Sequence, residues 1–234
     1  ADLVVQLHLH RNGREEDDRS RIGIYFAKKP VTRPIMSRPI VFGPINVDIP
    51  PGATDHRLSA AFELPIEVTL TGVLPHMHLI GKEMKISATL PDGATEPLIW
   101  IKDWNFNWQD VYLYRRPVVL PKGTKIEITA SYDNSSNNPF NPNSPPERML
   151  FGMETTDEMC LGLFQGIVNH PDDVKVLRNT LVRNMLAQIS EPSVTTESRA
   201  RLFSQFQEFA GPEMREIFRD FRFLKPAAPP KQDP

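Results

Sequence analysis

Residues 66–90 read IEVTLTGVLPHMHLIGKEMKISATL, and they hold two runs, 66–74 and 84–90, in which apolar and polar side chains alternate. Such alternation is typical of β-strands with one buried face. Further runs of this kind, divided by turn signals such as Pro121-Lys122-Gly123, lie at residues 98–102, 112–120, 125–132 and 159–168. Many short strands with this punctuation predict a mainly β protein, an antiparallel, jelly-roll-like β-sandwich of two packed sheets.

The spacing of the apolar residues changes from strand-like to helical after residue 171. Residues 172–189 follow Pro171-Asp172 with apolar side chains on one helical face, and residues 193–209 and 213–223 continue in the same manner. The sequence therefore predicts a C-terminal α-helical extension on the sandwich.

We expect four parts along the chain. They are the end of a preceding β domain with a linker (residues 1–40), the β-sandwich (41–170), the helical extension (171–225) and a disordered tail (226–234). In the first part, residues 3–10 and 21–27 are predicted strands. The proline-rich stretch 29–51 is expected to be an ordered linker with edge-strand pieces.

Composition excludes several classes of protein. The 234 residues carry a formal net charge of −2, so the concentrated basic surface that nucleic acid requires is missing. A single cysteine, Cys160, excludes a disulfide scaffold and a sulfur-rich zinc site. No apolar run reaches the roughly 20 residues of a transmembrane helix. The chain begins at Ala1 without an initiator Met, so we expect a processed or partial chain whose export signal lies upstream.

Histidines are the candidate metal ligands, and His76 and His78 are the pair of most interest. They follow an alternating strand, and side chains two residues apart on a strand share one face, so both rings can converge on one ion. The alternative is two partly exposed histidines bonded to backbone groups. His8 and His10 have the same spacing and the same two interpretations.

The remaining candidates have structural interpretations. His56 and His170 lie beside turn residues and are expected at the surface, without a role in metal binding. The aromatic run at residues 100–108 fits either the core and rim of a sandwich, which we favour, or a binding groove. No phosphate-binding loop or nucleophile motif is present.

Four segments together carry a resemblance to a known family: LVVQLH (3–8), NVDIPPG (46–52), HMHLIGK (76–82) and TTDEMC (155–160). In this order they resemble the C-terminal half of the copper type II, ascorbate-dependent monooxygenases, which include peptidylglycine α-hydroxylating monooxygenase and dopamine β-monooxygenase. The resemblance covers residues 1–168 and is greatest to the bacterial branch, in which the domain belongs to larger exported proteins. It implies a periplasmic or secreted location.

The resemblance implies a metal site and a reaction. His76, His78 and Met159 match the ligands of one copper, which activates O2 to hydroxylate a C–H bond of an organic substrate, with ascorbate or another one-electron reductant supplying electrons. His8 matches one ligand of the family's second copper, whose other histidines would come from an upstream domain of the same polypeptide. His10 has no matching role.

Departures from the family pattern bear on the substrate and on the cysteine. Leu74, Leu161 and Leu163 stand where the peptide hydroxylase has arginine, asparagine and tyrosine, so a peptide carboxylate would lack its partner here. Cys160 matches a disulfide-bonded cysteine, but the partner position falls near Ala130, so a free, buried thiol is expected.

Two other functions remain open at the level of sequence. One is a non-catalytic binding or assembly module of a larger exported protein. The other is a domain that carries copper or transfers electrons without oxygenating a substrate. Both remain because this chain holds only one of the second copper's expected ligands.

Overall fold

The computed structural model describes residues 13–30, 35–36 and 40–209, and the chain divides into two units, Ala1–Thr32 and Arg33–Pro234. In the first unit, the described residues 13–30 form no helix and no strand. The prediction of a strand at residues 21–27 is therefore wrong, because its alternating apolar side chains stay exposed and pair with no strand among the described residues. The predicted strand at residues 3–10, with His8 and His10, lies outside the described residues.

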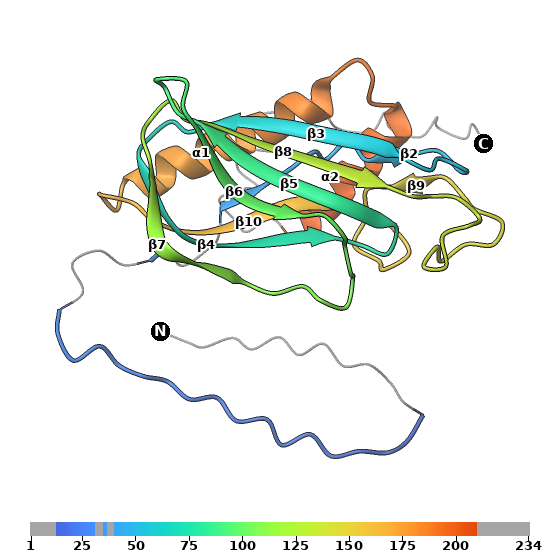
Figure 1. The fold of residues 1–234 in the computed structure, drawn as a ribbon, viewed down its shortest axis with the longest axis horizontal. Helices are drawn as coiled ribbons and strands as arrows, with labels where there is room; N and C mark the ends of the chain where they lie inside the picture. The colour runs from blue at the N-terminus through green and yellow to red at the C-terminus, as the bar shows by residue number, and fades with distance from the viewer. Residues whose placement is uncertain (1–12, 31–34, 37–39, 210–234) are drawn as a thin grey trace, which may run out of the picture. The chain divides into compact units, whose positions relative to one another are not determined.

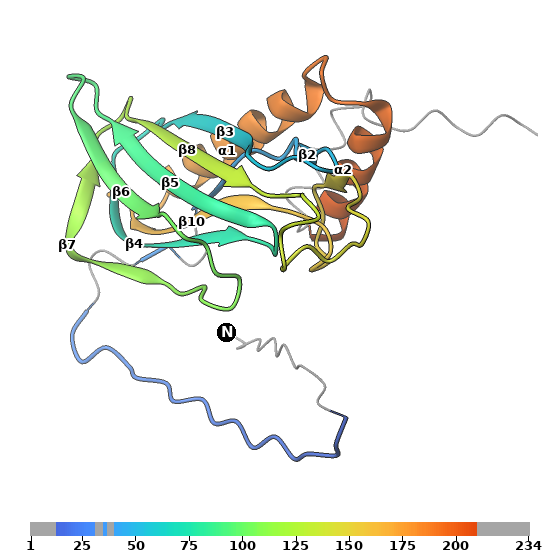
Figure 2. The ribbon, with the colours of Figure 1, turned by 45° about the vertical axis from the view of Figure 1, so that its right-hand side comes forward.

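The second unit contains two four-stranded antiparallel sheets (Figures 1 and 2). The first sheet has the order β1-β10-β4-β7, with bounds Ile40–Phe42, Cys160–Ile167, Val68–Met77 and Tyr112–Leu120. The second has the order β3-β8-β5-β6, with bounds His56–Glu63, Lys125–Tyr132, Gly81–Thr89 and Thr95–Ile101. A short pair, β2 (Asp48–Ile49) and β9 (Met149–Leu150), lies outside both sheets. The predicted mainly β, jelly-roll-like sandwich is confirmed.

The alternation in the sequence decides which side chains enter the core. Along β10, Cys160, Gly162, Phe164 and Gly166 are buried, and the residues between them are only partly buried. Met77 and Cys160 are directly opposite each other and both lie in the core. Cys160 is a free, buried thiol, as expected. The outer face of the same two strands carries His76 opposite Leu161 and Leu74 opposite Leu163.

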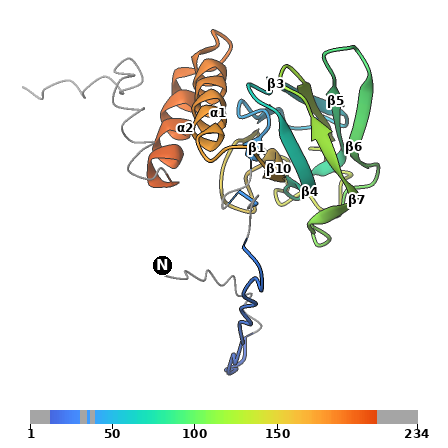
Figure 3. The same ribbon diagram turned by 90° about the vertical axis from the view of Figure 1, so that its left-hand side faces the viewer.

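Two helices follow the sandwich, α1 (Asp173–Ser190) and α2 (Thr196–Phe209), and they confirm the helical extension. Figure 3 shows them side by side, next to β1. The side-chain amide of Gln188 on α1 donates to the carbonyl of Gly43 (3.3 Å) and accepts the N–H of Ile45 (3.1 Å). Helix α1 is therefore hydrogen-bonded to the segment that follows β1, and not only packed on it.

The proline-rich stretch contains β1 and β2, and β1 is an edge strand. The predicted helix at 213–223 and the tail at 226–234 lie outside the described residues, and the predicted limits of the four parts stay predictions. Among the described residues, no helix combines the length and the hydropathy that crossing a membrane requires.

Asn134 joins the loop after β8 to two other segments. Its side chain is fully buried, and its amide nitrogen lies within 3.3 Å of the Ile49 carbonyl, 3.1 Å of the Pro50 carbonyl and 2.7 Å of the Glu147 carbonyl. The Asn134 side chain thus lies within hydrogen-bond distance of backbone carbonyls at the end of β2 and just before β9.

We predict that Asn134→Ala lowers the free energy of unfolding by about 3 kcal/mol, because it leaves buried carbonyl groups without a donor. Urea denaturation followed by tryptophan fluorescence measures the change. Asn137→Ala is the matched control, because Asn137 is exposed in the same loop and its substitution should leave stability nearly unchanged. Equal effects of the two substitutions would contradict this account of Asn134.

Candidate metal centre

His76 and His78 lie together at the end of β4, on the outer face of the first sheet. The centroids of their rings are 5.1 Å apart, with one ring edge-on to the other. His78 is 4% exposed, and His76 is half-buried. The i, i+2 spacing therefore brings the two imidazoles side by side, as the sequence predicts.

Each histidine has an oxygen acceptor at Nδ1. Nδ1 of His76 lies 2.6 Å from Oε1 of Gln109, and the Gln109 amide nitrogen donates to the Phe106 carbonyl (2.9 Å), which fixes the orientation of the amide. Nδ1 of His78 lies 3.0 Å from the carbonyl oxygen of Asp157. Both acceptors require a proton on Nδ1, so Nε2 of each neutral ring keeps its lone pair.

Burial favours the neutral form of both rings. Desolvation lowers the pKa of His76, against the opposing effect of its hydrogen bond to Gln109. Desolvation also lowers the pKa of His78, and hydrogen bonds to the backbone of Asp157 and of Glu154 oppose the change. A neutral imidazole with Nδ1 bonded to an oxygen is the form in which histidine binds metal ions.

Met159 directly precedes β10, as His78 directly follows β4. The last pair of the β4–β10 ladder is Met77 with Cys160, so His78 and Met159 are the first residues beyond its end, and their backbone N–H groups share Oε1 of Glu158. Met159 is 4% exposed, and its carbonyl oxygen accepts the phenol hydrogen of Tyr132 (2.9 Å). The described residues contain no cluster of three or more His, Cys, Asp or Glu suited to a metal.

Glu158 directly precedes Met159, and the sequence predicted no role for it. The residue is fully buried, and Oε1 accepts the backbone N–H groups of His78 (2.5 Å) and Met159 (2.8 Å). Oε2 has no hydrogen-bond partner. Desolvation raises the pKa of this carboxyl to about 8, against the effect of its backbone donors. One buried carboxyl group thus fixes the backbone of both His78 and Met159.

The aromatic run at residues 100–108 is divided between core and surface. Trp104 is buried, and its indole N–H donates to the His78 carbonyl (3.0 Å). The Phe106 ring is edge-on to His78, with centroids 6.2 Å apart. Trp100 and Trp108 are exposed. The favoured core interpretation therefore holds for Trp104, and Phe106 closes one side of the histidine pair.

Apolar side chains surround His76 on the outer face. Leu161 is its direct cross-strand neighbour, and Leu74 and Leu163 form the adjacent pair. All three leucines are partly buried. The three departures from the family pattern thus form one apolar patch beside the half-buried His76.

The other histidines lie away from this pair or outside the described residues. His8, the possible ligand of a second copper, is in the segment that the structure does not describe. His56 was expected in a turn at the surface, but it is the first residue of β3, pairs with Tyr132 and is partly buried. His170 is exposed, as expected.

The local sequence identifies only some of the residues that hydrogen-bond to the two histidines. Asp157 and Glu158 directly precede Met159 in the DEM segment, so their position beside a candidate ligand was visible. Gln109 gave no such signal, because its contact with His76 joins residues 33 apart along the chain. A loop that folds back onto a strand leaves no periodic pattern in the sequence.

Comparisons with known proteins add little to this geometry. No protein-family model matches the chain, and no curated protein matches it. A structure of infectious bursal disease virus, Gx strain, has a TM-score of 0.29 at 10% identity, over 64% of this chain and 38% of that one. The VP2 subviral particle of the same virus has a TM-score of 0.26 at 11% identity, over 56% of this chain and 32% of that one. The chain thus spans well under half of these proteins, and likenesses this low carry no argument.

We predict that Glu158 makes the metal-free protein less stable as pH rises from about 4.5 to about 8. Over that interval the unfolded chain has lost the proton that the folded chain still holds, so rising pH favours unfolding, and the full penalty is present above about 8. Glu158→Gln keeps the acceptor oxygen and removes the titration. The variant should therefore gain stability relative to the parent between pH 6 and pH 9, measured by urea denaturation. Glu96→Gln, at an exposed position, is the control and should show no such gain.

Proposed function

We propose that His76, His78 and Met159 bind one copper ion and that this chain is the catalytic domain of a copper-dependent monooxygenase. One observation carries the proposal: an oxygen acceptor at Nδ1 of each histidine leaves the Nε2 atoms of two adjacent rings available to a metal. His78 and Met159 are joined through their backbone N–H groups to the same Glu158 oxygen. The sequence resemblance supports the same three residues independently.

The donor set fits copper better than other common metals. Imidazole binds both oxidation states of copper, and a thioether prefers Cu(I). Three protein ligands leave a coordination position open. Copper bound there would supply the activation of O2, with electrons from ascorbate or another one-electron donor.

The chain's own residues would orient the ligands and receive the substrate. Gln109 and the Asp157 carbonyl hold the two rings, and Trp104 fixes the backbone of His78. The patch of Leu74, Leu161 and Leu163 beside His76 carries no charge. The proposed reaction therefore hydroxylates a C–H bond in an uncharged part of the substrate. A peptide carboxylate is disfavoured, because burying it against leucine leaves it unpaired.

The proposal includes a partner and a location. The resemblance suggests an upstream domain of the same polypeptide that completes a second copper site with His8, in the periplasm or outside the cell. A copper held there would supply one-electron transfer chemistry.

We predict that the purified chain binds about one copper ion, and that His76→Ala and His78→Ala each reduce the bound metal nearly to zero. Met159→Leu should weaken Cu(I) binding by about tenfold or more and affect Cu(II) less, because the lost donor is the soft thioether. Elemental analysis measures the stoichiometry, and competition with a coloured Cu(I) chelator measures affinity. His170→Ala, at an exposed histidine, is the control and should bind copper as the parent does.

A second experiment separates the enzyme from the alternatives. The copper-loaded full-length protein should consume O2 when ascorbate is added, and His76→Ala should abolish the consumption. Copper binding without O2 consumption would favour a copper carrier, and the absence of copper binding would favour a binding or assembly module.

A further inference from the structure

We infer that Arg201, on the helical extension, is a positioning residue for the metal centre and acts through Asp157 on the tautomer of His78. The inference rests on the proposed function for its importance to copper, although its structural part is testable without metal. It makes α2 a component of the site, whereas the family resemblance ends at residue 168 and gives the extension no role.

Two contacts connect α2 to His78. The guanidinium of Arg201 forms an ion pair and hydrogen bond with Oδ1 of Asp157, and both side chains are partly or largely shielded from solvent. The backbone carbonyl of the same Asp157 accepts the Nδ1 hydrogen of His78 at 3.0 Å. Arg201 therefore holds, through one residue, the acceptor that keeps the proton on Nδ1.

The segment that carries Asp157 is a close-packed turn. Its N–H donates to the Glu154 carbonyl (2.9 Å), and its Oδ2 accepts the Glu154 N–H (3.2 Å). Gly152 passes so close that a Cβ there would lie 1.8 Å from Oδ2 of Asp157 and 2.7 Å from Nη2 of Arg201. The Asp157 carboxylate is thus held by the turn on one side and by the Arg201 guanidinium on the other. The backbone carbonyl of Asp157 therefore has little freedom to move.

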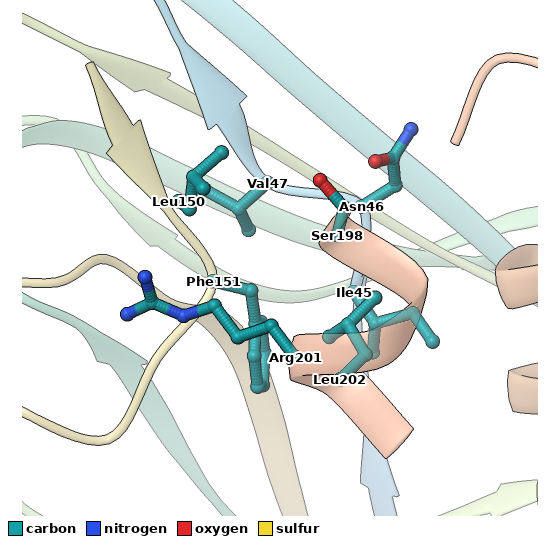
Figure 4. A pocket seen from close by; sticks show the side chains of 8 residues that line it. All are labelled: Ile45, Asn46, Val47, Leu150, Phe151, Ser198, Arg201 and Leu202. Carbon is teal, nitrogen blue, oxygen red and sulfur yellow. The ribbon is translucent and has the colours of Figure 1, made fainter. Parts of the chain in front are cut away.

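The position of Arg201 is itself well defined. Thr195 accepts the N–H of Ser198 through its hydroxyl (3.1 Å) and so caps the start of α2. Figure 4 shows Arg201 beside Phe151, with Ser198 and Leu202 of α2 facing Ile45 and Val47 across a cavity of about 10 Å³. A space of that size holds about one water molecule, so α2 packs closely on the strands next to the turn.

Losing the ion pair has a defined consequence for His78. The hydrogen bond from the Asp157 backbone N–H to the Glu154 carbonyl would remain, so the turn would loosen without unfolding. A less well-placed acceptor stabilises the Nδ1-protonated tautomer less, and the Nε2-protonated form, which has no lone pair for a metal at Nε2, becomes populated.

The test uses the metal-free chain first. Two-bond ¹H–¹⁵N spectra of the imidazoles report the tautomer of His78 in the parent and in Arg201→Gln, Arg201→Lys and Asp157→Asn. We expect protonated Nδ1 in the parent, retention of that form in Arg201→Lys, and a mixture of tautomers in Arg201→Gln and Asp157→Asn. Arg199→Gln is the matched control: Arg199 lies on the same helix and donates to the Glu191 carbonyl, so this variant should match the parent.

Copper affinity provides the second reading. Arg201→Gln should bind copper about tenfold more weakly than the parent, and Arg201→Lys should recover part of the loss. An unchanged His78 tautomer in both Arg201→Gln and Asp157→Asn, or a parent protonated at Nε2, would overturn the inference. If the parent shows the expected tautomers but binds no copper, the proposed function fails while the role of Arg201 at His78 stands.

Discussion

A single buried carboxyl oxygen organises the candidate metal centre. Oε1 of Glu158 accepts backbone hydrogens from His78 and Met159, at the point where the ladder between β4 and β10 ends. Without this acceptor two buried N–H groups would lack partners, which costs more than the hydrogen bonds themselves contribute. The carboxyl carries its own penalty, visible in its raised pKa, so the arrangement exchanges stability for a fixed backbone at two candidate ligands.

Around this point, different parts of the fold each hold one atom of the site. The loop after β6 supplies Gln109 to His76 and Trp104 to the carbonyl of His78. The turn after β9 supplies Asp157 to Nδ1 of His78, and α2 holds that turn through Arg201. The sandwich therefore provides the strand register, whereas loops and the helical extension determine the orientation of the rings.

Local periodicity explains which parts of the fold were predictable. The six alternating runs correspond to β4, β5, β6, β7, β8 and β10, and the helical spacing corresponds to α1 and α2. The strands β1, β2 and β9 were not predicted in detail, because two or three residues are too few for a pattern, and β3 was missed although it has eight. Apolar and other residues alternate at 21–27, but this run pairs with no strand among the described residues. Alternation indicates that a segment can form a strand, and a stable strand also needs a neighbouring strand to pair with. His76 and His78 were identifiable from spacing, whereas Gln109 and Arg201 depend on contacts between distant segments.

The register between β4 and β10 also determines when the site can exist. The hydrogen bond from His78 to Glu158 joins residues 80 apart, so a chain emerging from its N-terminal end exposes both histidines well before their supporting groups. At ordinary rates of synthesis the delay before Arg201 emerges is on the order of ten seconds. Until residues 157–158 emerge, His78 lacks the acceptor of its Nδ1, whereas Gln109 and β7 emerge earlier and can already contact His76 and β4. The candidate site is therefore complete only after both β10 and α2 have emerged.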